Sequence, residues 1–292
     1  MEVEKRIIAT DQDTSASLVI FTCENREHLL LKTYQSFSAN CSYKFKKIVL
    51  AIDGQIDPAA IDQIRPDVVI QHCRRSGYPN SISKALKIID TPYFFWLEDD
   101  WAFHRQIESG YFLNLMYNHP GWAEIVFSKE GPLKPESKNN SLGHNLYKTD
   151  FGFSANPCFC NTKHLQAAFI LLENSPKGDK LGVDGFENFL TSTFERENIT
   201  CVVVDPIDHL PISHEGYLES TPRNWHMTNS LESKTKNHLL TMPAPSAFRK
   251  LLMIGKLFRT FLSLSIKQLS DNKVYELCFR IMSSAMTIKK DE

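Results

Sequence analysis

The sequence has no long hydrophobic run and no excess of charge of either sign. No stretch approaches the roughly 18 consecutive apolar residues of a membrane-spanning helix, and the amino terminus lacks the pattern of a signal peptide. The 33 Lys and Arg residues nearly balance the 34 Asp and Glu residues, which leaves a formal charge of -1. A chain without a long-range positive field is a poor partner for a polyanion. We therefore expect no nucleic-acid partner, and a cytoplasmic protein.

The cysteines lack the paired spacing of a zinc site or a redox motif. All 7 are scattered, at positions 23, 41, 73, 158, 160, 201 and 278. We interpret them as reduced thiols, most of them buried. With 42% hydrophobic and 23% charged residues, the chain has the composition of an ordinary globular protein, long enough to bury a core in one or two domains.

Short apolar runs alternate with helical patterns over residues 17–101. The strand patterns are Leu18–Phe21, Lys47–Ile52, Val68–Gln71 and Tyr93–Leu97, and the helical patterns are Arg26–Phe37, Ala59–Ile64 and Ser81–Ile89. Asn25 precedes the first helix, where its side chain could cap the first turn. This alternation predicts a parallel, doubly wound sheet with helices on both faces. Such sheets bind ligands beyond the carboxyl ends of their strands.

The alternation becomes less regular after Trp101. Helical patterns cover residues 106–117, 162–173 and 185–197, and strand patterns cover residues 123–127 and 200–204. The polar residues 128–145 lie between them, and we interpret this stretch as a surface loop.

The tail, residues 246–292, is basic and amphipathic. Arg249, Lys256 and Lys267 fall nearly in line at about 100° per residue, opposite apolar side chains. No acidic residue lies between Arg249 and Lys267. A helix of this kind can lie peripherally on the anionic inner face of a membrane, or it can pack on the body of the protein. The sequence leaves both interpretations open.

The strand pattern Tyr93–Leu97 runs directly into three consecutive carboxylates, Glu98, Asp99 and Asp100. Mutual repulsion and loss of water at a strand end would raise the pKa values of these groups, and a divalent cation with oxygen ligands offsets that cost. The alternative is purely structural, because acids can also begin a helix and face the positive end of its dipole.

Leu97–Asp100 resembles the metal-binding Asp-x-Asp motif of GT-A glycosyltransferases, either as Glu98-x-Asp100 or with Asp99 and Asp100 as the acting pair. Other segments resemble family 2 of these enzymes in the expected order: TCENREHLLLKTYQS at 22–36, Asp53-Gly54, and RSGYPNSISKA at 75–85. The resemblance implies an α/β fold of the GT-A type, with a Rossmann-like, mostly parallel central sheet flanked by helices and a C-terminal helical extension.

The resemblance further implies a nucleotide-sugar donor, with a UDP-type nucleotide favoured, and a divalent metal, Mn2+ or Mg2+, that bridges its phosphates. The donor-binding residues it implies are Thr22, Glu24, Arg26, Asp53, Arg75, Glu98 and Asp99. Asp53 would accept a hydrogen bond from the base, and Glu98 or Asp99 would bind the ribose. The metal ligands it implies are Asp100, Glu98 and the late histidine His214. The chain departs from the family pattern at Glu98, which replaces an Asp, and at Ile52-Asp53-Gly54, which replaces Asp-Asp-Gly.

The acceptor half of the resemblance rests on two segments. LGVDGFENFL at 181–190 resembles the region that carries the catalytic base of inverting members, which removes the acceptor proton. It places Glu187 on the base position, with Asp184 as the second candidate, although either acid could simply stabilise a first helical turn. GFSANP at 152–157 resembles the acceptor-side loop over the donor sugar.

From these patterns we divide the chain into a flexible lead (1–16), a GT-A domain (17–245) and the basic amphipathic tail (246–292). Within the GT-A domain, residues 17–101 form the nucleotide-binding half and residues 102–245 the acceptor half. The acceptor we expect is a glycan or a lipid-linked intermediate, as in polysaccharide biosynthesis.

Two other functions would keep this fold. A sugar-phosphate nucleotidyltransferase usually carries a Gly-rich phosphate loop after its first strand, whereas Thr22–Arg26 contains no glycine. A non-catalytic nucleotide-sugar binding protein would retain the fold alone, but clustered acids without a ligand would destabilise the strand end. The sequence therefore favours a metal-dependent, inverting glycosyltransferase.

Overall fold

A computed structural model of the protein describes residues 13–128, 132–175, 181–207 and 211–216, together with positions 255, 258–259, 261–262, 265 and 277–278. The side chains of residues 181–184 are outside this description. The chain divides into two units, residues 1–239 and 240–292, and all labelled helices and strands belong to the first. The predicted helix of residues 246–292 thus lies almost entirely outside the described residues. Within them, no helix is long and apolar enough to span a bilayer.

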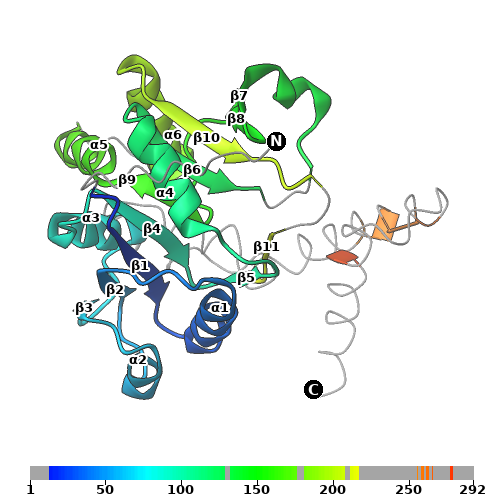
Figure 1. Ribbon diagram of the computed structural model, residues 1–292. Helices are drawn as coiled ribbons and strands as arrows, with labels where there is room; N and C mark the ends of the chain where they lie inside the picture. Colours follow the sequence, from blue (N-terminus) through cyan, green and yellow to red (C-terminus); the bar gives the residue numbers. More distant parts are fainter. Residues whose placement is uncertain are drawn as a thin grey trace. The chain divides into compact units, whose positions relative to one another are not determined.

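A nine-stranded sheet forms the centre of the first unit, in the order β3-β2-β1-β4-β9-β6-β10-β8-β7 (Figure 1). The strands are β1 (Ala16–Cys23), β2 (Lys47–Asp53), β3 (Val68–Gln71), β4 (Tyr93–Glu98), β6 (Trp122–Phe127), β7 (Ser141–Gly143), β8 (Leu146–Lys148), β9 (Cys158–Asn161) and β10 (Thr200–Val204). The first four are parallel to one another, and β6 is parallel to β10. This is the predicted mostly parallel sheet.

The helices are α1 (Glu27–Asn40), α2 (Pro58–Ile64), α3 (Tyr78–Ile88), α4 (Ser109–Asn118), α5 (Thr162–Asn174) and α6 (Leu181–Arg196). Each strand and helix predicted for residues 17–101 is present. The ends differ by a few residues, as is usual where helices fray. Helix α6 is kinked at Gly185, whose φ of 70° is not helical.

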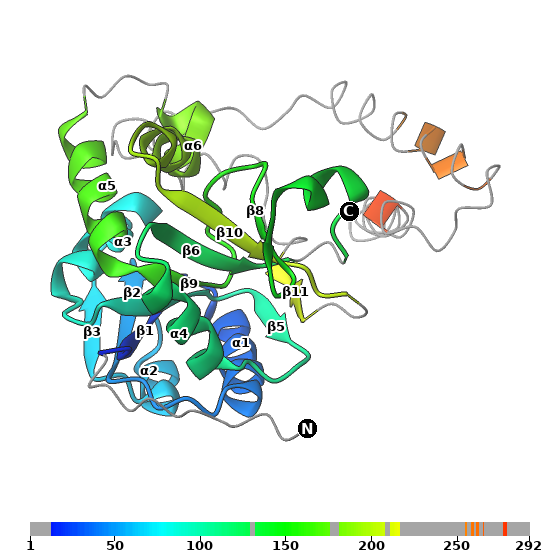
Figure 2. The same ribbon diagram turned by 45° about the horizontal axis from the view of Figure 1, so that its top comes forward.

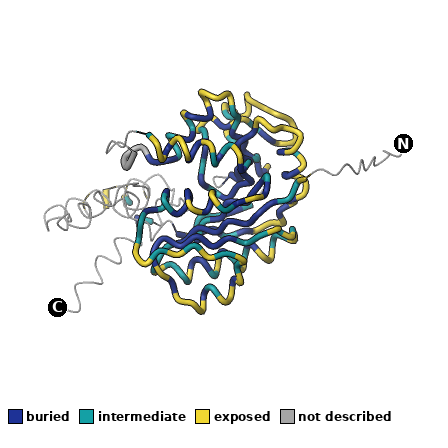
Figure 3. Tube along the Cα trace, turned by 90° about the vertical axis from the view of Figure 1, so that its left-hand side faces the viewer, coloured by how far each residue is buried: buried dark blue, intermediate teal, exposed yellow. Residues whose placement is uncertain are grey.

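Helices bury both faces of the sheet, which explains why its strands are apolar at successive positions. Leu18 and Ile20 of β1 pack in one layer with α1, α2 and α4. Val19 and Phe21 pack in the other layer with α3, α5 and α6. Neighbouring residues of one strand therefore enter opposite layers, and the sheet lies as the buried centre of the unit in Figure 3.

The structure contains two features that the sequence did not predict. Strand β9 inserts antiparallel between β4 and β6 of the mostly parallel sheet. The predicted surface loop of residues 128–145 contains an exposed 3₁₀ helix (Pro135–Asn140) and β7, which pairs with β8 at the sheet edge. These strands are too short to show a periodic pattern, and their partners lie far away in the sequence.

A second, two-stranded sheet pairs β5 (Trp101–Phe103) with β11 (Ile212–His214) in antiparallel fashion. Strand β5 follows β4 after a two-residue turn, and Figure 2 shows β11 beside it. In this register His214 lies opposite Trp101. A late segment of the chain is thereby held at the carboxyl end of β4.

Gly152 is the close-contact position at which the segment after β8 meets helix α6. Its φ of 76° lies in the left-handed region, and a Cβ there would overlap the side chain of Thr191. The amide of Phe153 donates to Thr191 Oγ1 at 3.0 Å. This contact fixes the segment that runs from Gly152 toward β9.

We predict that Gly152→Ala lowers the free energy of unfolding by about 2 kcal/mol or more, because it adds both backbone strain and steric overlap. Gly110→Ala is the matched control. Gly110 lies in α4 with open space around its Cβ position, so alanine there should stabilise the helix by up to about 1 kcal/mol. Urea unfolding followed by circular dichroism measures both, and equal stability of the two variants would contradict the prediction.

Candidate active site

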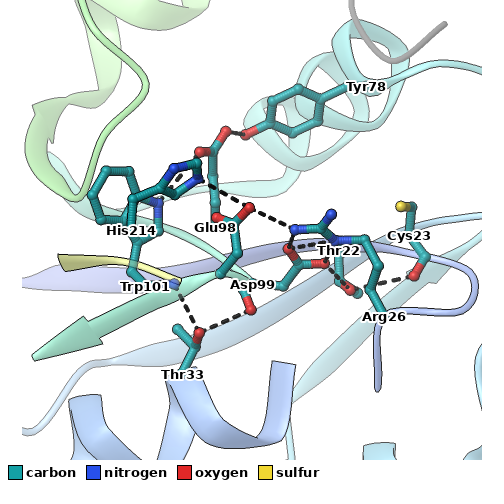
Figure 4. A network of polar contacts seen from close by, with 10 residues as sticks. Thr22, Cys23, Arg26, Thr33, Tyr78, Glu98, Asp99, Trp101 and His214 are labelled. Carbon is teal, nitrogen blue, oxygen red and sulfur yellow. Dashed lines mark hydrogen bonds and ion pairs between the residues drawn. The ribbon is translucent and has the colours of Figure 1, made fainter. Parts of the chain in front are cut away.

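The carboxyl ends of β1, β2 and β4 meet at one edge of the sheet. In the parallel registers, Cys23 lies opposite Asp53 and Phe21 lies opposite Glu98. The turns that follow these strands therefore converge, as expected for an open α/β sheet. Figure 4 shows the side chains that meet there, from β1, α1, α3, β4, β5 and β11 and from the turns after β1 and β4.

Arg26 forms the centre of this group. It occupies the N-cap position of α1, and no side chain caps the helix, so the capping predicted for Asn25 is wrong. Asn25 instead adopts a left-handed backbone with φ 66°. The Arg26 guanidinium contacts Asp99 through Nε, at 2.9 Å and 3.0 Å, and contacts Asp100 Oδ2 through Nη2 at 2.6 Å.

Asp99 is buried and fully engaged. Besides Arg26, it accepts a hydrogen bond from Thr22 Oγ1 at 2.6 Å. Its carbonyl accepts from Thr33 Oγ1 at 2.8 Å, and Thr33 Oγ1 in turn accepts from the amide of Trp101 at 3.0 Å. Helix α1 thus holds both the side chain and the backbone of the turn after β4.

Asp100 faces His214, which comes from β11. His214 Nε2 lies 3.1 Å from Asp100 Oδ2, and its ring lies 4.7 Å from that of Trp101. The amide of Glu215 donates to the Asp100 carbonyl at 2.7 Å. Gly216 packs so closely on Asp100 that any Cβ there would overlap the carboxylate. The structure therefore brings the predicted late histidine to the predicted carboxylate.

Glu98 points to a different partner. Tyr78 of α3 donates to Glu98 Oε1 at 2.5 Å, and the indole of Trp101 donates to Oε2 at 3.5 Å. Burial, together with the negative charge of Asp100, raises the pKa of Glu98 to about 8. Burial also raises the pKa of Asp99 to about 6, against the opposing effect of Arg26.

The pKa of Asp100 shifts in the opposite direction from those of Glu98 and Asp99. Burial alone would raise its pKa, but the hydrogen bond and charge of His214 and the charge of Arg26 outweigh it, so the pKa of Asp100 is lowered. Of the three consecutive acids, Asp100 is thus the carboxylate most strongly held in its ionised form.

Asp53 organises the segment before α3. Its Oδ1 accepts from the amides of Ser76 and Gly77, the latter at 2.9 Å, and its Oδ2 lies 3.4 Å from Arg75 Nε. Arg75 is thereby held beside the ends of β1 and β2. Glu24 lies there too, because a Cβ on Gly54 would come 2.7 Å from Glu24 Oε2.

Comparison with known proteins gives a likeness of structure and none of sequence. No protein-family model and no curated protein sequence matches the chain. The crystal structure of GalNAc-T7 with UDP, GalNAc and Mn2+ matches with a TM-score of 0.51 and 14% identity, over 68% of this chain and 43% of that one. The S. aureus TarS 1-349 structures, alone and with UDP, match with TM-scores of 0.48 and 0.46 and identities of 15% and 13%, over 77% of this chain and 69% of theirs.

The chain has the GT-A glycosyltransferase fold. At these identities the likeness is one of fold alone, and the chain spans less than half of the length of GalNAc-T7, 43%. What the GT-A fold of this chain can do chemically is decided by its own side chains.

The acceptor-side prediction concerns Glu187 of α6. Its carboxylate accepts from the amide of Ala155 at 2.6 Å, so the GFSANP segment and the LGVDGFENFL segment are in contact. The negative charge of Glu187 also contributes to the raised pKa of Glu98. Glu187 of α6 and Glu98 at the end of β4 therefore interact electrostatically. The side chain of Asp184, the second candidate, lies outside the described residues.

Glu124 is a further acid that the sequence analysis missed. It is fully buried on β6, with an exposure of 0%, and accepts from the amide of Ser154 at 3.0 Å. Burial raises its pKa well above the ordinary value, and Glu187 adds to the effect. An acid in the middle of the apolar strand Trp122–Phe127 is the sequence feature that could have identified it. Adjacent amides of one loop thus bind two different glutamates.

Asp100 and His214 place two possible metal-ligating atoms side by side. No group of three or more His, Cys, Asp or Glu side chains in the described part of the chain could hold a metal, so the predicted set Asp100, Glu98 and His214 does not form a protein cage. Asp100 and His214 do converge. One or two protein ligands, with phosphate oxygens and water, suit a cation that is bound together with a nucleotide.

We predict that Glu124 makes stability depend on pH. Because its pKa is raised on folding, its contribution is complete below its ordinary value of 4.5 and is lost as the pH rises through the folded-state pKa. The unfolding free energy of the wild type should therefore fall relative to that of Glu124→Gln as the pH rises above the ordinary value of 4.5. Urea unfolding at a series of pH values measures it, with Glu136→Gln as the exposed control. A pH-independent difference between the wild type and Glu124→Gln would contradict the prediction.

Proposed function

We propose that the protein is a metal-dependent glycosyltransferase that moves a sugar from a UDP-type nucleotide-sugar donor to a glycan or lipid-linked acceptor, with inversion at the anomeric carbon. The observation that carries the proposal is the turn after β4, in a GT-A fold, where Asp100 meets His214 while Asp99 holds Arg26. Such clusters of ionisable groups with perturbed pKa values are typical of functional sites.

The proposed donor site depends on where the charged side chains lie. Asp100 and His214 would hold the divalent cation, and a cation there neutralises the charge that builds on the leaving nucleoside diphosphate. Arg26 and Arg75 lie at the same strand ends and would add positive charge for the phosphates. The UDP, GalNAc and Mn2+ in the GalNAc-T7 structure support a donor and a cation of this class.

The contact to the base of the donor is proposed for Asp53, as the resemblance implied. Asp53 would have to accept a hydrogen bond from uracil while both of its oxygens already contact residues 75–77. Glu24, beside Gly54, lies at the same strand ends. We keep Asp53 as the proposed contact to the base, and Glu98 or Asp99 as the proposed contact to the ribose.

For the acceptor, we propose Glu187 of α6 as the catalytic base. Glu187 would accept the proton of the acceptor hydroxyl as that oxygen attacks the anomeric carbon. Its position beside the loop amide of Ala155 and its electrostatic interaction with Glu98 support this role. A membrane-bound acceptor would suit the basic pattern of residues 246–292, and this contact stays a prediction.

We predict that UDP binds only weakly without metal and at least about tenfold more tightly with Mn2+, a difference of roughly 1.4 kcal/mol. Asp100→Asn should abolish this enhancement, because it removes the ionised ligand. Asp90→Asn is the control, since Asp90 is exposed and pairs with Lys47 at the far end of the sheet. Calorimetric titration of UDP, with GDP for comparison, measures it. If neither nucleotide binds with or without Mn2+, the proposed function fails.

We predict that Glu187→Gln lowers kcat by about 10²- to 10⁴-fold, the usual contribution of a general base, while UDP binding changes little. Glu195→Gln is the matched control, because Glu195 is an exposed acid of the same helix. The measurement is the initial rate of UDP release from UDP-glucose, UDP-N-acetylglucosamine and UDP-N-acetylgalactosamine with mixed glycan acceptors. A kcat for Glu187→Gln equal to that of Glu195→Gln would exclude Glu187 as the base.

A further inference from the structure

The Arg26 guanidinium binds the same Asp100 oxygen that faces His214, between the two residues proposed as metal ligands. Arg26 Nη2 lies 2.6 Å from Asp100 Oδ2, and His214 Nε2 lies 3.1 Å from the same oxygen. Both Asp100 and Arg26 are largely shielded from water, with side-chain exposures of 9% and 19%. A contact between opposite charges is stronger in such surroundings than in bulk water.

The second acid keeps Arg26 in this place. Asp99 Oδ1 lies 2.8 Å from Arg26 Nη2, and both Asp99 oxygens also accept from Arg26 Nε. Thr22 holds Asp99 from the other side through a 2.6 Å hydrogen bond. Asp99 thus acts as the anchor of Arg26, whereas Asp100 is the residue that Arg26 shares with His214.

A guanidinium and a divalent cation cannot share one carboxylate oxygen without strong repulsion, because Arg stays charged at every relevant pH. A metal ion that arrives alone and binds this oxygen beside His214 must therefore separate Arg26 from Asp100. A diphosphate changes this balance, since its oxygens bind the guanidinium in a fork-like geometry and also complete the coordination of the metal. Nucleotide and metal then assist each other.

We propose that Arg26 is a built-in cation that competes with the divalent metal for Asp100 and is drawn away by the nucleoside diphosphate. Metal binding is thereby made dependent on the nucleotide. The inference rests on the proposed function and describes how metal binding at that site is regulated. It assigns Arg26 a role as a positioning residue, in addition to the contact with the donor that the resemblance implied.

The test is the binding of Mn2+ alone, followed by the electron paramagnetic resonance signal of free Mn2+, and then in the presence of UDP. For the wild type, residues 1–292, we expect weak binding of Mn2+ alone and an affinity at least about tenfold higher with UDP. Arg26→Gln should bind Mn2+ alone at least about tenfold more tightly than the wild type and should gain less from UDP. The Gln side chain keeps one amide donor for Asp99 while it removes the charge.

The control variant is Arg196→Gln, an exposed Arg on α6 that pairs with Glu197. It should leave Mn2+ binding unchanged. A double variant, Arg26→Gln with Asp100→Asn, should lose the gain in Mn2+ affinity, because Asp100 is the ligand that the first substitution frees. If the gain persists in the double variant, the metal binds elsewhere and the inference is overturned.

The inference is also overturned if folded Arg26→Gln binds Mn2+ alone no more tightly than the wild type. Should this variant fail to fold, the wild type still decides, because equal Mn2+ affinities with and without UDP would exclude the coupling. Failure of the proposed function gives a different result, because neither UDP nor GDP then binds to the wild type at all. The competition between Arg26 and the metal for Asp100 is measured separately, with Mn2+ and no nucleotide.

Discussion

The ion pair between Arg26 and the adjacent carboxylates Asp99 and Asp100 is the interaction on which the architecture of the site depends. Two neighbouring acids at a strand end would repel each other and lose hydration. The guanidinium offsets that cost and, in doing so, ties the turn after β1 to the turn after β4. Burying such a group is tolerated only because every partner is in place, since one unpaired buried charge typically costs about 3–5 kcal/mol.

Backbone pairing connects the residues around Arg26 to the second half of the chain. The turn after β4 continues into β5, and the pairing of β5 with β11 sets His214 against Asp100. On the other side of the sheet, the amides of Ser154 and Ala155 bind Glu124 and Glu187. The candidate acceptor base is thus held by a loop that is itself held by a fully buried acid. Both halves of the candidate site depend on contacts between distant segments.

The electrostatics of the site suit a negatively charged ligand that arrives with a cation. The site contains the acids Glu98, Asp99 and Asp100, yet Arg26 already compensates part of their charge. Glu98, hydrogen-bonded to Tyr78, has a raised pKa, so it adds little negative charge at neutral pH. What is left is one strongly ionised carboxylate beside a histidine. This combination agrees with the proposed cation that is shared with a diphosphate, because too few protein ligands converge, among the residues that the structure describes, to enclose one.

Local sequence patterns determined the secondary structure of the first part of the chain and the place of the candidate site. Apolar periodicity predicted the strands and helices of residues 17–101, and the position of Glu98–Asp100 after an apolar strand predicted the candidate site, because both signals lie within short windows. Other features were decided by tertiary structure. Two predictions were wrong: that Glu98 completes a three-residue metal site, and that Asn25 caps α1. Two features were not predicted, the antiparallel strand β9 and the buried acid Glu124. Each depends on which distant segment packs beside it, as when Tyr78 takes Glu98 and Arg26 takes Asp99. Side-chain partners between separate elements are set by the register of the sheet and the packing of its helices, and no local window of sequence contains that information.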